Sequence, residues 1–243
     1  MSALFTQLAG GAGALQDMTD KMIEFVTAHE VAHQWWHGIV GSDSREHPVV
    51  DEALAQYSAI VYLEDRYGAE RAKQDGDSNV KANYQMMRMM GSPDGAADRP
   101  ARGASSSVYA GLVYGKAPYF YAKLRQMIGD AAFFNGIRAY VDKYRMQIAP
   151  ARGVVDVVAG GAKAADARKV KKLAAHWLDE AHGDADLGKA DLSRMLGGKL
   201  GGGALDEDTM KKLMEGLGGG GGGGLDSDMM KKLMEGFGGG GSD

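Results

Sequence analysis

The stretch His29-Glu30-Val31-Ala32-His33 is the most informative part of this sequence, because it spaces two histidines one helical turn apart. Residues four apart on a helix lie on the same face, so both imidazoles can bind one metal ion. Glu30 lies about 100° further around the helix, beside that ion rather than on it. A general base that deprotonates a metal-bound water needs this position. The stretch therefore predicts a helix that carries a metal site.

The surrounding residues support a helix, since apolar side chains recur at steps of three and four residues. The residues of this face are Met22, Phe25 or Val26, His29, His33 and Trp36. We expect Asp17 or Thr19 to cap the helix at its N-terminus and Gly38 to end it. The alternative interpretation is a pair of core histidines that hydrogen-bond to backbone groups.

A second helix is expected from about Pro48 to Gly68, because proline suits a first helical turn and glycine a helix end. Eighteen residues separate His33 from Glu52, which is enough for two helices to pack antiparallel and bring Glu52 to the metal. Two imidazoles and a carboxylate leave a tetrahedral zinc ion one open position for water. The alternative for Glu52 is an exposed helix carboxylate, the usual situation of a glutamate.

These residues resemble the M1 family of zinc peptidases, the aminopeptidase N type within the gluzincins. The segment 29–36 (HEVAHQWW) resembles the family's zinc-helix signature, and 51–55 (DEALA) resembles its Asn-Glu-Gly-Phe-Ala stretch. The segment 113–117 (VYGKA) resembles the family's Tyr-x-Lys-Gly segment. The resemblance covers roughly residues 20 to 182. It implies a mainly α fold, the helical part of a thermolysin-like gluzincin catalytic domain.

The resemblance also implies a mechanism and its residues. One zinc ion would be held by His29, His33 and Glu52. Glu30 would act as general base, and Tyr114 would stabilise the tetrahedral intermediate. A donor to a developing oxyanion contributes roughly 10²–10³ in rate. The chain would then be a zinc metallopeptidase that hydrolyses peptide substrates, with exo- and endopeptidase activity both open. For Tyr114 the alternative is a packed tyrosine whose hydroxyl is satisfied.

Gln56 occupies the position, one turn beyond Glu52, where related zinc peptidases can orient a histidine ligand through a carboxylate. An amide can still accept the imidazole N–H, but it adds no negative charge. Asp51 is a possible source of the missing charge. Ala117 is a second departure, since the family often has glycine there.

One segment of the family pattern has no counterpart. M1 relatives carry a Gly-x-Met-Glu-Asn segment on an edge strand before the zinc helix, and its glutamate helps to hold the free amine of the substrate. Only 28 residues precede His29 in this chain, and none of them matches. The expectation is an N-terminally incomplete catalytic domain. The alternatives are a zinc-binding but catalytically incompetent fragment or pseudo-enzyme, and a half that needs a partner for the missing portion.

The composition of the 243 residues, 44% hydrophobic and 25% charged, is typical of a soluble globular protein. The net charge of −4 gives no indication of a nucleic-acid partner. The absence of cysteine excludes disulfides and thiolate metal sites. The N-terminus lacks the pattern of a signal peptide, and no run of eighteen apolar residues occurs. We therefore expect no membrane span and, by default, a cytoplasmic protein.

Periodicity and turn residues predict the rest of the catalytic part. The expected elements are one or two helices at 69–90 interrupted near Gly76, a loop at 91–111, and helices at about 117–128, 130–144 and 165–182. Four further histidines receive no role. His37 lies one turn past the site, and His47, His176 and His182 are expected to be ordinary surface residues.

The segment 188–243 differs in composition from the rest. It contains seven consecutive glycines at 218–224, and its unit at 205–216 (LDEDTMKKLMEG) recurs at 225–236 (LDSDMMKKLMEG). Each unit has the cap, apolar face and glycine stop of a helix too short to be stable alone. We therefore expect a catalytic domain at 1–187 and a flexible tail at 188–243. The alternative is an interaction protein whose repeats fold against a groove of a protein partner.

Overall fold

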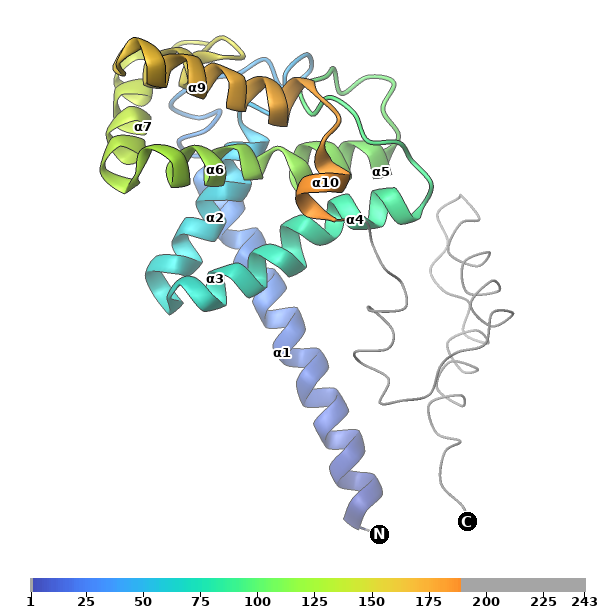
Figure 1. Ribbon diagram of the computed structural model, residues 1–243. Coiled ribbons are helices and arrows are strands. Elements are labelled where there is room, and N and C mark those ends of the chain that lie inside the picture. Colours follow the sequence, from blue (N-terminus) through green and yellow to red (C-terminus); the bar gives the residue numbers. More distant parts are fainter. Residues whose placement is uncertain (1, 189–243) are drawn as a thin grey trace. The chain divides into compact units, whose positions relative to one another are not determined.

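The computed structural model describes residues 2–188 of the chain (Figure 1). Within this range the protein is built from helices, and the only β-type pairings there are isolated bridges, Trp36 to Val40 and Gly41 to Ile148. The predicted mainly α fold is therefore confirmed. The repeated units at 205–216 and 225–236 lie outside the described residues. No helix in the described part is both long and apolar enough to cross a membrane.

The helices follow one another along the chain as labelled in Figure 1. They are α1 (Ser2–Ala32), α2 (Glu52–Tyr67), α3 (Ala69–Gly76), α4 (Ala82–Met89), α5 (Ser106–Tyr109), α6 (Pro118–Ile128), α7 (Asp130–Tyr144), α8 (Gly153–Gly160), α9 (Ala164–Ala174) and α10 (Gly183–Leu187). Three π-helical stretches of this part of the chain are η1 (Asp77–Lys81), η2 (Ala110–Lys116) and η3 (Ala175–Asp179). Such stretches are rare and occur frequently at functional sites.

Helix α1 differs from the prediction at both ends. It is helical from Ser2, so neither Asp17 nor Thr19 is its cap. It ends at Ala32, six residues before Gly38. There the backbone changes to tighter turn bonds, with the N–H of Trp35 donating to the carbonyl of Ala32 at 2.9 Å. His33 therefore lies in the turn that follows α1.

Helix α2 begins at Glu52, four residues later than expected from Pro48, because Asp51 is the cap that starts it. The Asp51 carboxylate accepts a hydrogen bond from the backbone N–H of Glu52 at 3.0 Å. The predicted end at Gly68 is confirmed, and this glycine has a φ of 89°. Helices α1 and α2 pack against each other (Figure 1). The first residue of α2 is thereby held beside the last turn of α1.

Aromatic side chains of the core hold α2 against α6 and α7. The ring of Tyr57 stacks on Tyr121 of α6 at 6.1 Å and meets Phe133 of α7 edge-on at 5.7 Å. All three side chains are buried. Burying a large apolar side chain contributes about 1.5–3 kcal/mol, so these contacts fix the position of α2 and of its first residue.

The stretch η2 approaches α4 unusually closely. A Cβ on Gly115 would lie 2.5 Å from the backbone nitrogen of Tyr84, and one on Gly111 would lie 2.4 Å from the Cβ of Met87. No side chain fits at either position, so two glycines four residues apart form the contact surface. This contact fixes how closely η2 lies to α4, and with it the position of Tyr114, which precedes Gly115.

Several predicted boundaries change. The helices at 69–90 and their interruption near Gly76 are confirmed, but the loop at 91–111 ends at Ser105, whose hydroxyl caps α5. The helix predicted at 165–182 ends at Asp179, and α10 follows it separately.

Helix α8 was not predicted, because its valines and glycines have low helix propensity. Its buried side chains, which include Val154 and Val158, pack against α7 and α9 and stabilise the helix in context.

Candidate active site

The sequence-predicted ligands meet at one point. His29 comes from the last turn of α1, His33 from the turn after it, and Glu52 from the start of α2. The two Nε2 atoms are 3.1 Å apart, and each lies 3.3 Å from Oε2 of Glu52. The side chain of His29 is 9% exposed, and those of His33 and Glu52 are 22% and 19% exposed. The three atoms therefore converge in a site that is sheltered but still open to solvent.

The tautomer of His33 follows from its second nitrogen. Nδ1 lies 3.0 Å from the backbone carbonyl oxygen of Trp36. A carbonyl only accepts, so Nδ1 carries a proton, and Nε2 is the nitrogen that faces His29 and Glu52. A hydrogen bond of this kind is typical of histidines that bind metal ions.

The three atoms have the spacing of a zinc site. A tetrahedral ion with ligand bonds of about 2.0–2.1 Å separates its ligand atoms by about 3.3 Å. The observed separations are 3.1, 3.3 and 3.3 Å. Oε2 of Glu52, the carboxylate atom that faces both Nε2 atoms, is buried without a hydrogen-bond partner. Buried atoms with unsatisfied lone pairs are costly unless a cation or a proton compensates them. The residues present therefore fit a zinc ion.

Gln56 and Asp51 have other partners than those expected. Nε2 of Gln56 donates to the backbone carbonyl of Tyr114 at 3.4 Å, so this amide supports η2 rather than a histidine ring. Asp51 accepts from Ser44 Oγ at 2.6 Å and pairs with Nδ1 of His37 at 3.1 Å. Gln56 therefore does not orient a histidine ring of the site, and Asp51 contacts the imidazole of His37 rather than that of His29 or His33. The ring of His33 is oriented instead by the backbone carbonyl of Trp36, which cannot be predicted from a residue type.

The structure also brings Tyr114 to this group. Its ring lies 5.9 Å from the ring of His29, and Glu52 is the nearby charged group that acts on its hydroxyl. Burial and the negative charge of Glu52 raise the pKa of the Tyr114 phenol well above its ordinary value. The phenol is therefore protonated at neutral pH and able to donate a hydrogen bond.

Tyr109 is a neighbour that the sequence did not identify. Its ring meets that of Tyr114 edge-on at 5.6 Å. Two residues five apart do not share a face of an α-helix, but they do in a π-helix. The five-residue spacing was the available signal, and it is informative only once the π-helical backbone is known.

Glu30 lies in the last turn of α1, next to His29 in the chain, and its side chain is exposed. It is therefore accessible to water on the helix turn that carries the first of the two histidines. Its role as general base stays a prediction.

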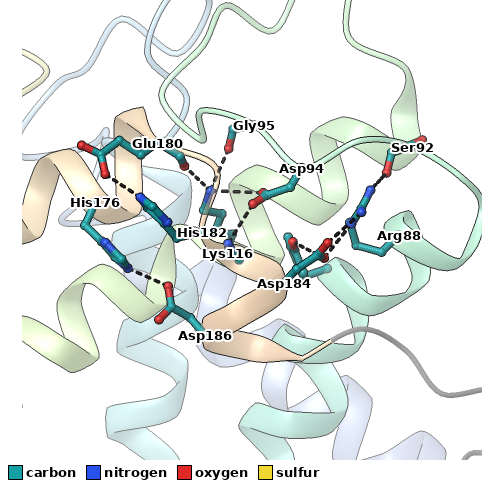
Figure 2. Close-up of polar contacts among 12 residues, drawn as sticks. Arg88, Ser92, Asp94, Gly95, Lys116, His176, Glu180, His182, Asp184 and Asp186 are labelled. Carbon is teal, nitrogen blue, oxygen red and sulfur yellow. Dashed lines mark hydrogen bonds and ion pairs between the residues drawn. The ribbon is translucent and has the colours of Figure 1, made fainter.

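Lys116, two residues beyond Tyr114, is completely buried. Its ammonium group donates to Oδ1 of Asp94 at 3.2 Å and to the backbone carbonyls of Gly95 and Glu180 at 2.8 and 2.5 Å (Figure 2). Burial lowers the pKa of Lys116, and the charge of Asp94 opposes that shift. The sequence placed Lys116 in a family segment without a role. These bonds connect the stretch that carries Tyr114 to two other parts of the chain.

Comparison with known proteins agrees with this arrangement. The family model described as the Peptidase family M1 domain matches residues 6–177, a range that contains the converging histidines, Glu52 and Tyr114. No curated protein and no solved structure matches the chain. Since the match spans more than half of the 243 residues, the chain belongs to peptidase family M1.

Proposed function

We propose that this protein hydrolyses peptide bonds with one zinc ion held by His29, His33 and Glu52. Membership of a peptidase family supports the reaction class. The observation that supports the metal is the triangle of two imidazole nitrogens and a carboxylate oxygen with sides of 3.1–3.3 Å. Three such ligands and one open position are typical of catalytic rather than structural zinc.

When bound, zinc would supply Lewis acidity, which polarises a carbonyl group and makes water a stronger nucleophile near neutral pH. Glu30 takes a proton from the attacking water and delivers it to the leaving amine. Its exposure beside His29 supports this assignment. Tyr114 donates its hydroxyl proton in a hydrogen bond to the carbonyl oxygen as negative charge develops there. The raised pKa of the phenol supports a donor rather than an acceptor.

In this proposal the catalytic unit comprises residues 1–187, and 188–243 is an appendage with two repeated units that can bind a protein partner. The substrate is a peptide. Whether the cleaved bond lies at the N-terminus of the substrate or inside it depends on groups other than His29, His33, Glu52, Glu30 and Tyr114.

Hydrolysis of fluorogenic aminoacyl and internally quenched peptide substrates tests the proposal. We expect turnover that a chelator abolishes and that added zinc restores. A chain that binds zinc stoichiometrically but cleaves no substrate of either type would be a catalytically incompetent zinc protein, and the proposed function would be wrong.

A further inference from the structure

A second group of metal-binding side chains lies where η3 leads into α10. His176, Glu180 and His182 each offer a ligand atom, and these atoms all lie within 4.8 Å of one another. We propose that they form a second site, for a divalent transition-metal ion such as Zn²⁺, separate from the site at His29, His33 and Glu52. Figure 2 shows both imidazoles and Asp186 in this group.

The two imidazoles stack face to face, with centroids 4.2 Å apart and an angle of 3° between their planes. Nε2 of His176 lies 2.7 Å from Oδ2 of Asp186, and Nε2 of His182 lies 2.7 Å from Oε2 of Glu180. A carboxylate on one nitrogen of a histidine is the usual support of a metal ligand. We assign this supporting role to Asp186, which leaves Nδ1 of His176 for the ion. The ion would replace the proton that His182 shares with Glu180.

The backbone that carries these side chains is already fixed. The carbonyl of Glu180 accepts from the buried Lys116, and the N–H of Gly183 donates to Oδ2 of Asp94 at 2.8 Å (Figure 2). Both bonds lead to the buried Lys116–Asp94 ion pair, so the segment on either side of His182 is attached to the core. A backbone ordered in advance reduces the entropic cost of binding.

The side chains themselves have room to adjust. His176, His182 and Glu180 are 36%, 44% and 51% exposed. The χ2 torsion of histidine has a broad energy minimum, so turning either ring is inexpensive. Tetrahedral zinc separates its ligand atoms by about 3.3 Å, so the ligand atoms, which lie within 4.8 Å of one another, would move closer together when the ion binds. Water can complete the coordination from the exposed side.

The ligand set selects the class of ion. Imidazole nitrogens favour Zn²⁺, Cu²⁺ and Ni²⁺, whereas Mg²⁺ and Ca²⁺ favour sites made of oxygen atoms. Charge favours a cation as well. The carboxylates of Asp186 and Glu180, each 2.7 Å from an imidazole nitrogen, place negative charge beside the two rings, which attracts a divalent ion.

The test uses tag-free protein in which His33→Ala and Glu52→Ala remove the first ligand group, so that its result does not depend on the proposed peptidase function. All six histidines of the chain lie within the described residues, so every imidazole can be controlled. We expect this variant to bind one Zn²⁺ by isothermal titration calorimetry. Adding His176→Gln and His182→Gln should weaken binding by about 100-fold or more, since a lone carboxylate holds zinc poorly.

His47→Ala is the matched control, because His47 is also 44% exposed and paired with one carboxylate, that of Asp98. It should leave the titration unchanged. Cu²⁺ bound in the parent variant should show couplings to two nitrogens by electron paramagnetic resonance. Glutamine retains the hydrogen bond to each carboxylate, and an unchanged circular dichroism spectrum verifies folding. Equal Zn²⁺ affinity with and without the two histidines, or copper spectra with fewer than two nitrogens, would overturn the second site.

Discussion

Lys116 and Asp94 form a buried ion pair with an Nζ–Oδ1 distance of 3.2 Å, two residues beyond Tyr114. The side chain of Lys116 is 0% exposed and that of Asp94 is 8% exposed. The pair connects η2 to the loop after α4 and, through Glu180 and Gly183, to the chain before α10. The position of Tyr114 therefore depends on an interaction that does not touch His29, His33 or Glu52.

Lys116→Met tests how much this ion pair contributes to the stability of the fold. The substitution leaves Asp94 buried without its cation, and breaking a buried pair in this way costs about 3–5 kcal/mol. We expect the free energy of unfolding, measured by urea titration, to fall by about that amount. Lys143→Met is the control, because Lys143 lies in the last turn of α7 and its ammonium packs over the ring of Tyr144 rather than in an ion pair. Equal stability of the Lys116→Met variant and the parent protein would contradict this role.

Metal content separates the ligands from the proposed base. In a His176→Gln/His182→Gln background, which excludes the second group, His33→Ala should lose stoichiometric zinc, since two protein ligands rarely hold the ion. Glu30→Gln should retain zinc and lose turnover, because it removes a proton acceptor and not a ligand. Elemental analysis after dialysis and a peptidase assay measure the two effects. An empty Glu30→Gln protein together with a zinc-loaded His33→Ala protein would show that the roles are assigned wrongly.

Tyr114→Phe removes one hydroxyl group from the site. We expect kcat to fall by roughly 10²–10³, as for other oxyanion donors, with KM little changed and zinc retained. Tyr67→Phe is a suitable control, because its exposed hydroxyl donates to Glu24 on the surface of α1. A fall in zinc content with Tyr114→Phe would assign the phenol to the stability of the metal site instead.

Much of the candidate site could be predicted from the sequence. A helix repeats every 3.6 residues, so the spacing of His29 and His33 predicts side chains on one face. Although α1 ends at Ala32, the N–H of His33 still donates to the carbonyl of His29 at 3.3 Å, which continues the helical turn as far as His33. The separation of Glu52 and the glycine at position 68 similarly reflect local rules of loop length and helix ends. These predictions depend on neighbouring residues, which is why they agree with the structure.

Other features depend on contacts that no local rule contains. The carbonyl of Trp36 that fixes the His33 tautomer could belong to any residue type. Gln56 bonds to the backbone of Tyr114 because η2 lies against α2, and only the tertiary structure brings them together. The same holds for α8, whose valines form a helix through burial rather than propensity. His176 and His182 were expected to be ordinary surface residues. In the structure their rings stack on each other, although the two residues are six positions apart in the sequence.

Deletion of residues 188–243 tests the proposed domain boundary. The repeated units are about ten residues long and separated by glycine, so each can bury too little apolar area to stabilise a core. We expect the melting temperature of the remaining protein to change by no more than about 2 °C, the smallest shift that 1 kcal/mol produces in a protein of this size. A larger fall would mean that the repeats contribute to the folded catalytic part and that the boundary is misplaced.

The last prediction concerns recognition of the substrate's N-terminus. An aminopeptidase must hold a free α-amine, which requires a carboxylate near the cleaved bond, and extended peptides commonly pair with a strand edge. Glu30 and Glu52 are assigned to other roles, no strand forms within residues 2–188, and the sequence contains no Gly-x-Met-Glu-Asn segment. Positioning contributes several kcal/mol, about 7–11 in favourable cases, to the lowering of a barrier. We therefore expect this polypeptide to hydrolyse aminoacyl substrates slowly and to discriminate little between a peptide with a free amine and its acetylated counterpart.

Measuring kcat/KM for such a matched pair is decisive. Rapid turnover with a strong preference for the free amine would require another carboxylate at the site, and Asp51 is excluded because its carboxylate is engaged by Ser44, His37 and the N-terminus of α2.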